Sequence, residues 1–229
     1  MPRVRALRSD GCSPKQIARI LGVRPAVVAP LVRAIAGQEA VDAPEPAAVG
    51  CWVSPGWSVG LAVEEDRDWP EREGCGTEGS GLVAVLVARE RRRRSDAVSV
   101  CGWLVDTYCL GVKNALGPRV MDQLELRRFV RCYFAPFDGE PVDAPIELAR
   151  SLVWGAIEYA RGLGFEPARD FAPTADHLGP LTRPSGVRFG HEGKPLYVQG
   201  PYDDPNRIMR KLHDAVGRDN FHFVTEVVV

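Results

Sequence analysis

The chain has 229 residues, of which 45% are hydrophobic and 26% charged, and its formal net charge is −1. This apolar content can bury a core, which excludes disorder along the whole length, and the length suits one full domain with a smaller module. The longest apolar stretches have seven residues, against the roughly 20 that a membrane-spanning helix needs, so no membrane partner is expected.

The cysteine pattern bears on compartment and cofactors. Six cysteines are scattered along the chain without a C-x-x-C pair, which favours free thiols over disulfides or a zinc site. The N-terminus lacks the apolar segment of a secretory signal. We therefore expect a cytoplasmic protein with no cofactor and no bound metal.

Charge is unevenly distributed along the chain. Residues 1–40 carry seven basic and two acidic residues, whereas residues 41–80 carry nine acidic and two basic ones. Such zoning predicts separate structural units. We divide the chain into a helical module at 1–36, a linker at 37–50 that is rich in alanine, proline and glutamate, and a body at 51–229. An acidic, glycine-rich loop is expected near 61–81.

The module shows the signals of two short helices. Ser13 can cap a helix that begins at Pro14, and Gly22 follows where a left-handed residue ends a helix. A second helix is predicted to begin near Pro25. The pair resembles a helix-turn-helix of the resolvase or homeodomain-like kind, and the matching residues are Ile17, Ala18, Leu21, Gly22, Val23, Val28 and Leu31.

This resemblance implies that the second helix enters the major groove of DNA. Its exposed positions offer Arg24 and Arg33 but no Asn, Gln, Ser or Thr, and Pro30 lies inside the helix. Two interpretations stay open: a DNA binder with little base recognition, or a module that contacts protein. The candidate nucleic-acid-binding residues of the module are Arg3, Arg5, Lys15, Arg19, Arg24 and Arg33.

The body is predicted to be α+β with a mainly antiparallel or mixed sheet, because strands and helices do not alternate strictly. Helical periodicity is present at 121–134, at 143–163 with Asp143 as the cap, and after Asp204-Pro205 up to Gly217. Strands are predicted at 82–89 and 98–108 as one hairpin, at 186–189 and 196–199 as a second, and at 221–228.

The tip of the first predicted hairpin is unusually basic. It can follow a phosphate backbone, or it can be a solvated turn whose charge is partly neutralised by Glu90 and Asp96. We keep both hypotheses. The arginines concerned are Arg89, Arg91, Arg92, Arg93 and Arg94.

Asp106, Cys109 and Lys113 lie near the end of a predicted strand and are candidate residues of an enzymatic pocket. A cysteine beside a cation can act as a thiolate, but no histidine partner or oxyanion motif accompanies it, so a buried thiol is the favoured interpretation. Asp203 and Asp204 are predicted to cap a helix rather than to bind a metal.

Three stretches of the body, at 104–115, 154–171 and 193–224, are similar to an uncharacterised bacterial domain with no assigned activity. The resemblance implies that most of the body is one domain. Trp154 falls on the polar side of its predicted helix, so we expect the acidic 61–80 segment, the loop with Trp52 and Trp57, or a partner to cover it.

These observations favour a nucleic-acid-binding protein in a regulatory or accessory role, with DNA ahead of RNA as the partner. Contacts with phosphate would outnumber contacts with bases. The body would form the interface of a homodimer, make a second contact with the phosphate backbone of the nucleic acid, or bind an effector. The alternatives are an RNA- or ribosome-associated factor that uses the arginine hairpin, an enzyme, and a protein-interaction module with a degenerate helix-turn-helix.

Overall fold

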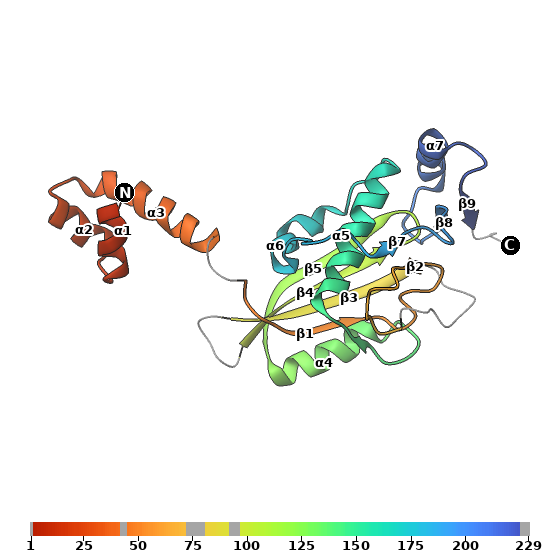
Figure 1. Cartoon of the computed structure of the whole chain (residues 1–229), viewed down its shortest axis with the longest axis horizontal. Helices are drawn as coiled ribbons and strands as arrows, with labels where there is room; N and C mark the ends of the chain where they lie inside the picture. The colour runs from red at the N-terminus through yellow and green to blue at the C-terminus, as the bar shows by residue number, and fades with distance from the viewer. Residues whose placement is uncertain (1, 42–44, 72–80, 92–96, 225–229) are drawn as a thin grey trace. The chain divides into compact units, whose positions relative to one another are not determined.

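The computed structural model describes residues 2–41, 45–71, 81–91 and 97–224 (Figure 1). The chain forms two compact units, Met1–Glu45 and Pro46–Val229. The first is helical and the second contains a five-stranded antiparallel sheet with helices, which confirms the predicted α+β class. Within the described ranges, every helix is too short or too polar to cross a membrane.

The first unit consists of α1 (Pro2–Ser9), α2 (Pro14–Leu21) and α3 (Pro25–Val41). The start of α2 lies where the sequence predicts it, because the Ser13 hydroxyl accepts a hydrogen bond from the Gln16 amide and the Gln16 side chain accepts one from the Ser13 amide. The helix ends at Gly22, whose left-handed φ is 66°.

All three helices contribute to one small core in this unit. Its centre is Ile17, which is fully buried, and Leu7, Cys12, Leu21 and Leu31 pack around it while half-buried. The buried side chains are Val4, Ile17, Ala18, Val28, Val32 and Ile35.

The predicted linker at 37–50 was too long. Helix α3 runs through Pro30 to Val41, and strand β1 (Ala48–Val53) has already begun at residue 48. Alanine has the highest helix propensity of the residues, so an alanine-rich stretch without apolar periodicity can still extend a helix that has formed.

The sheet of the second unit has the strand order β5-β4-β3-β1-β6, and each neighbouring pair is antiparallel. The predicted hairpin is confirmed by β3 and β4, which pair from Leu82 opposite Asp106 to Glu90 opposite Val98. The strands besides β1 are β3 (Leu82–Glu90), β4 (Ala97–Asp106), β5 (Gly111–Asp122) and β6 (Val142–Asp143).

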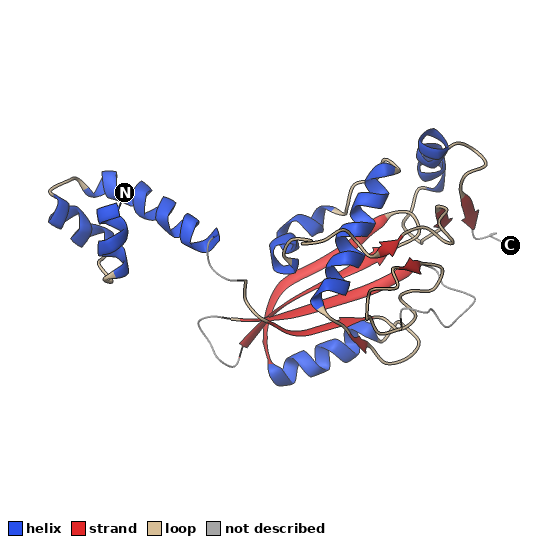
Figure 2. Ribbon diagram, viewed as in Figure 1, coloured by secondary structure: helices blue, strands red, loops and turns tan. Residues whose placement is uncertain are grey.

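Helices α4 (Gln123–Phe134) and α5 (Ile146–Gly162) lie against the sheet (Figure 2). On β3, Val85 and its alternate neighbours belong to the same core cluster as α5, whereas Leu86 and its alternate neighbours pack with α4. Successive strand residues face opposite sides, so a strand covered on both faces is apolar throughout. This explains the unbroken apolar run of β3.

The second predicted hairpin was wrong. Strand β7 (Val187–Arg188) pairs with β2 (Ala62–Val63), and β8 (Leu196–Val198) pairs in parallel with β9 (His222–Val224). Between β7 and β8 the chain does turn, with a single bridge from His191 to Lys194. The turn signal was therefore genuine, but the two short strands beside it join different sheets.

Several element boundaries also differ from the sequence predictions. Strand β5 was not predicted, and Asp143 lies in β6 instead of capping α5, whose N-cap is Pro145. Helix α7 (Pro205–Val216) has the predicted cap, since the Asp204 carboxylate accepts a hydrogen bond from the Arg207 amide. The 72–80 part of the expected acidic loop and the last predicted strand residues, 225–228, lie outside the described residues.

Trp154 is covered within the chain, but by a segment that the sequence did not indicate. The segment comprises the 3-10 helix η1 (Arg169–Thr174) and helix α6 (Ala175–Leu178). The indole NH of Trp154 donates to the Gly179 carbonyl at 2.8 Å, and its ring meets that of Phe171 edge-on at 5.1 Å.

Candidate nucleic-acid interface

The first unit displays all of its described cationic side chains to solvent. Two lie on α1, two on α2, one in the turn before α3 and one on α3, and Arg8 at the end of α1 is exposed as well. The six predicted positions are Arg3, Arg5, Lys15, Arg19, Arg24 and Arg33, and each is exposed. Their placement follows from the core, which takes the apolar positions of each helix and leaves the polar ones outside.

None of these cations forms an ion pair within the described part of the chain. The acids among the side chains described in this unit are Asp10 and Glu45, the latter at its last residue. Seven exposed cations against two exposed acids among the described side chains give this small unit a positive surface field that attracts polyanions.

Arg89 was wrongly predicted to contact phosphate. Only 4% of this residue is exposed, and its guanidinium donates hydrogen bonds to the carbonyls of Pro46, His177 and Leu178. Arg89 lies two residues after Val87 on β3, so the two side chains face the same side of the sheet. The Arg89 side chain therefore points into the layer beneath α5 and α6. A second buried arginine, Arg150 of α5, donates to the same Leu178 carbonyl.

The rest of the arginine tip is only partly described. Arg91 follows β3 directly and is exposed. Arg92, Arg93 and Arg94 lie outside the described residues. Of the five arginines predicted for this tip, the structure therefore places one on the surface and one in the interior.

The predicted pocket residues Asp106, Cys109 and Lys113 do not form a reactive centre. Asp106 Oδ1 accepts hydrogen bonds from the amides of Tyr108 and Cys109, at 3.0 and 2.9 Å, and thereby fixes the turn between β4 and β5. Burial raises the pKa of Asp106 to about 6, although these backbone hydrogen bonds oppose the rise. The carboxylate is structural.

The Cys109 thiol is fully buried. Burial, and next the Asp106 carboxylate, raise the pKa of Cys109 well above its ordinary value, which keeps the sulfur protonated and unreactive. The Lys113 ammonium is engaged by Asp203, with Nζ at 3.0 and 3.1 Å from the two carboxylate oxygens. Cys109 therefore lacks the activation that a nucleophile needs.

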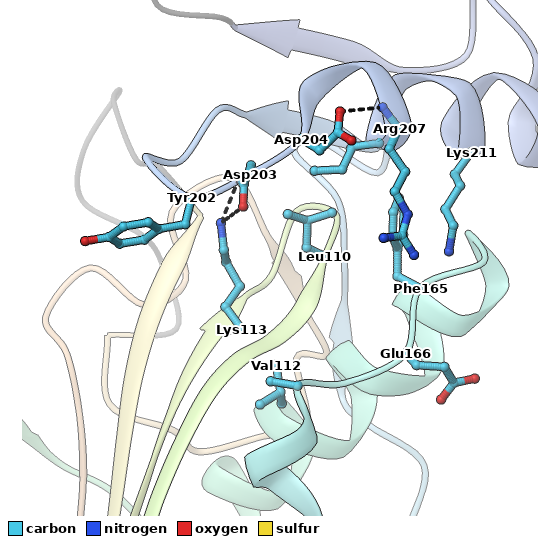
Figure 3. Close-up of a pocket in the computed structure, with 12 residues that line it drawn as sticks. Leu110, Val112, Lys113, Phe165, Glu166, Tyr202, Asp203, Asp204, Arg207 and Lys211 are labelled. Carbon is cyan, nitrogen blue, oxygen red and sulfur yellow. Dashed lines mark hydrogen bonds and ion pairs between the residues drawn. The ribbon is translucent and has the colours of Figure 1, made fainter.

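A cleft of about 540 Å³ does lie beside Lys113 (Figure 3). Arg207 and Lys211, one turn apart on α7, extend toward Phe165 and Glu166, and the Lys211 ammonium lies 5.1 Å from the Phe165 ring centre. The acids of the cleft are engaged by neighbours: Asp203 by Lys113, Glu166 by Arg161, and Asp204 by the cap of α7. The cleft can hold a small polar molecule. Of its lining residues, Lys113 was predicted as a pocket residue and Asp203 and Asp204 as helix caps, whereas Arg207 and Lys211 were not predicted.

The Arg207 and Lys211 positions carried a usable signal. Their spacing of four places both on one side of α7, next to the side that buries Ile208 and Leu212. The exposure of Ile20, Val23 and Val27 in the first unit was not predicted from the sequence either.

Other chemistry is sparse in the described ranges. No group of three His, Cys, Asp or Glu side chains there could hold a metal ion, and the five cysteines described are free thiols. Comparisons with protein-family models, with curated proteins and with solved structures find no match for this chain.

Proposed function

We propose that this is a DNA-binding protein in which the unit formed by α1, α2 and α3 contacts the phosphate backbone of duplex DNA. The observation that carries the proposal is the set of seven exposed cations, none of them in an ion pair within the described residues. A cation without an acidic partner releases counterions from DNA when it binds a phosphate, and this release is the main source of affinity.

The helix arrangement supports the same proposal. A glycine turn joins α2 to α3, as in the helix-turn-helix that the sequence resembles. Arg24 lies in the turn just before α3, and Arg33 lies on the exposed side of the helix. Both residues can contact phosphate, and phosphate contacts position a protein without selecting a sequence.

A regulatory or accessory role in the cytoplasm fits this binding mode, with the body as the site of dimerisation, of a second backbone contact or of effector binding. RNA is the less favoured partner. One reason is that the major groove of an A-form RNA helix is too narrow for an α-helix. A second is that, of the hairpin arginines that the structure describes, Arg91 is exposed but Arg89 is buried and cannot contact RNA.

The salt dependence of binding tests the proposal. We expect affinity for several unrelated duplexes to fall steeply with salt, and Arg24→Ala combined with Arg33→Ala to weaken each duplex about equally. Two lost phosphate contacts should reduce the slope of log K against log salt by about 2.

The matched control is Arg127→Ala with Arg131→Ala, two exposed arginines of α4 in the body. This pair should leave affinity and slope unchanged if the first unit carries the interface. Equal effects of the two double variants would contradict the assignment to the first unit. A salt-independent affinity would contradict binding through phosphates.

A further inference from the structure

Three large apolar side chains of the first unit are exposed, and they lie within eight consecutive residues. Ile20 on α2 is 57% exposed, Val23 in the turn is 42% exposed, and Val27 in the first turn of α3 is 48% exposed. Single exposed apolar residues are ordinary on protein surfaces, but a cluster marks an interaction site. Arg19 and Arg24 lie within the same stretch and are exposed too.

The exposed side of α3 continues this apolar character. Val28, Val32 and Ile35 face the core, while the exposed positions among the described side chains are Pro25, Ala26, Val27, Pro30, Arg33 and Ala34. Among the described side chains of α3, which run from Pro25 to Ile35, Arg33 alone can donate or accept a hydrogen bond. This surface, from Ile20 through Ala34, therefore contacts a ligand mainly through van der Waals packing.

One apolar group is available on base edges in the major groove, which is wide enough to admit an α-helix. That group is the C5 methyl of thymine. The cations that flank the apolar side chains have no acidic partner in the described residues, and this charge complements a phosphate backbone on either side of the groove.

We propose that α3 recognises thymine methyl groups in the major groove of A·T-rich duplex DNA, with Val27 as the principal contact. The inference rests on the proposed DNA-binding function and adds a preference to it. The same contacts discriminate against RNA, which has uracil in place of thymine.

The test compares duplexes that differ in single methyl groups. The full chain is titrated with a duplex of alternating A·T pairs and with the same duplex containing deoxyuridine in place of thymidine. A buried methyl contributes about fourfold in affinity, so loss of one or two contacted methyls should weaken binding roughly 4- to 15-fold. Conversely, 5-methylcytosine places a methyl in the major groove of a G·C duplex and should strengthen binding there.

The variant Val27→Ser removes the proposed contact at an exposed position and should bring the thymine-to-uracil affinity ratio close to 1. Its salt slope should stay that of the unaltered chain, because the phosphate contacts remain. The matched control is Val120→Ser, which alters a valine of similar exposure, 52%, on β5 of the body and should preserve the ratio.

The outcomes separate the two proposals. Salt-dependent binding to DNA with equal affinity for thymine and uracil duplexes would overturn this inference and leave the proposed function standing. Absence of binding to any duplex would overturn both. A Val27→Ser variant that changes the mass in light scattering but not the affinity ratio would show that the surface binds a second copy of the chain instead.

Discussion

Arg89 and Arg91 lie two residues apart and have opposite environments. The guanidinium of Arg89 is buried against three backbone carbonyls, whereas Arg91 is exposed. We expect Arg89→Ala to lower the free energy of unfolding of the body by about 3 kcal/mol or more, because buried carbonyls lose a charged donor. Arg91→Ala should change it by less than about 0.5 kcal/mol. Chemical denaturation of both variants measures the difference, and equal losses would refute the role given to Arg89.

Asp106 gives the body a pH dependence of a defined sign. Its pKa is about 6 in the folded chain, above its ordinary value of 3.8, so the fold binds a proton more tightly than the unfolded chain does. Stability from this group is therefore greatest below pH 3.8 and is lost as the pH rises toward 6.

The measurement is the free energy of unfolding of Asp106→Asn relative to the unaltered chain, from pH 4 to pH 7. The difference should move in favour of the asparagine variant as the pH rises, since an amide does not ionise. Asp170→Asn, at an exposed position of η1, is the matched control for the replacement of a carboxyl by an amide. A difference for Asp106→Asn that stays constant over this pH range would show that the Asp106 carboxyl is not perturbed by burial.

At the scale of elements, the segment of η1 and α6 is fastened to the body by side chains from other elements. Arg89 of β3 and Arg150 of α5 bind its carbonyls, Trp103 of β4 donates to Thr174, and Trp154 of α5 packs on Phe171. These contacts hold a chain segment whose own hydrogen bonds are few and local.

Trp154→Ala tests how much this fastening contributes. We expect a loss of about 3 kcal/mol in the free energy of unfolding, because a large ring and an indole hydrogen bond are removed together. Leu124→Ala, at a position 57% exposed on α4, should cost far less. A Trp154→Ala variant as stable as the unaltered chain, measured by denaturation, would show that the segment is held without the ring.

The sequence predicts elements best where a local pattern is sufficient. The starts and ends of α2 and α7 follow from Ser13, Gly22, Asp204 and Gly217, which are caps. Strand β5 escaped prediction because Gly117 and Pro118 interrupt it, and an edge strand tolerates such residues.

Long-range features were harder to infer. The pairing of β2 with β7 and of β8 with β9 depends on strands of two or three residues, which contain no signal for their partners. Arg89 was predicted to belong to an exposed charge run, although its spacing of two from Val87 and of four from Val85 places it on the same, inward face of the strand. In the proposed interface, the cations were visible in the sequence, but the exposure of Val27 depends on how α3 packs.

At the scale of the whole molecule, each unit has its own core, and the two cores share no residue among those described. We expect two transitions in calorimetric unfolding. Ile17→Ala, which removes the centre of the small core, should lower only the transition of the first unit. Trp154→Ala should lower only the other. A single transition shifted by both variants would mean that the units unfold cooperatively.

Strand β3 has a consequence for the chain during its synthesis. Its residues are buried on both faces of the finished sheet, yet β4, β5, α4 and α5 all follow it in the sequence. While these partners are still being made, the apolar run is a segment prone to self-association. The arginines that begin at Arg91 emerge immediately after it, and a cluster of like charges beside an apolar strand opposes aggregation. We therefore expect the charged hairpin to reduce aggregation of the nascent body, whether or not it later contacts a nucleic acid.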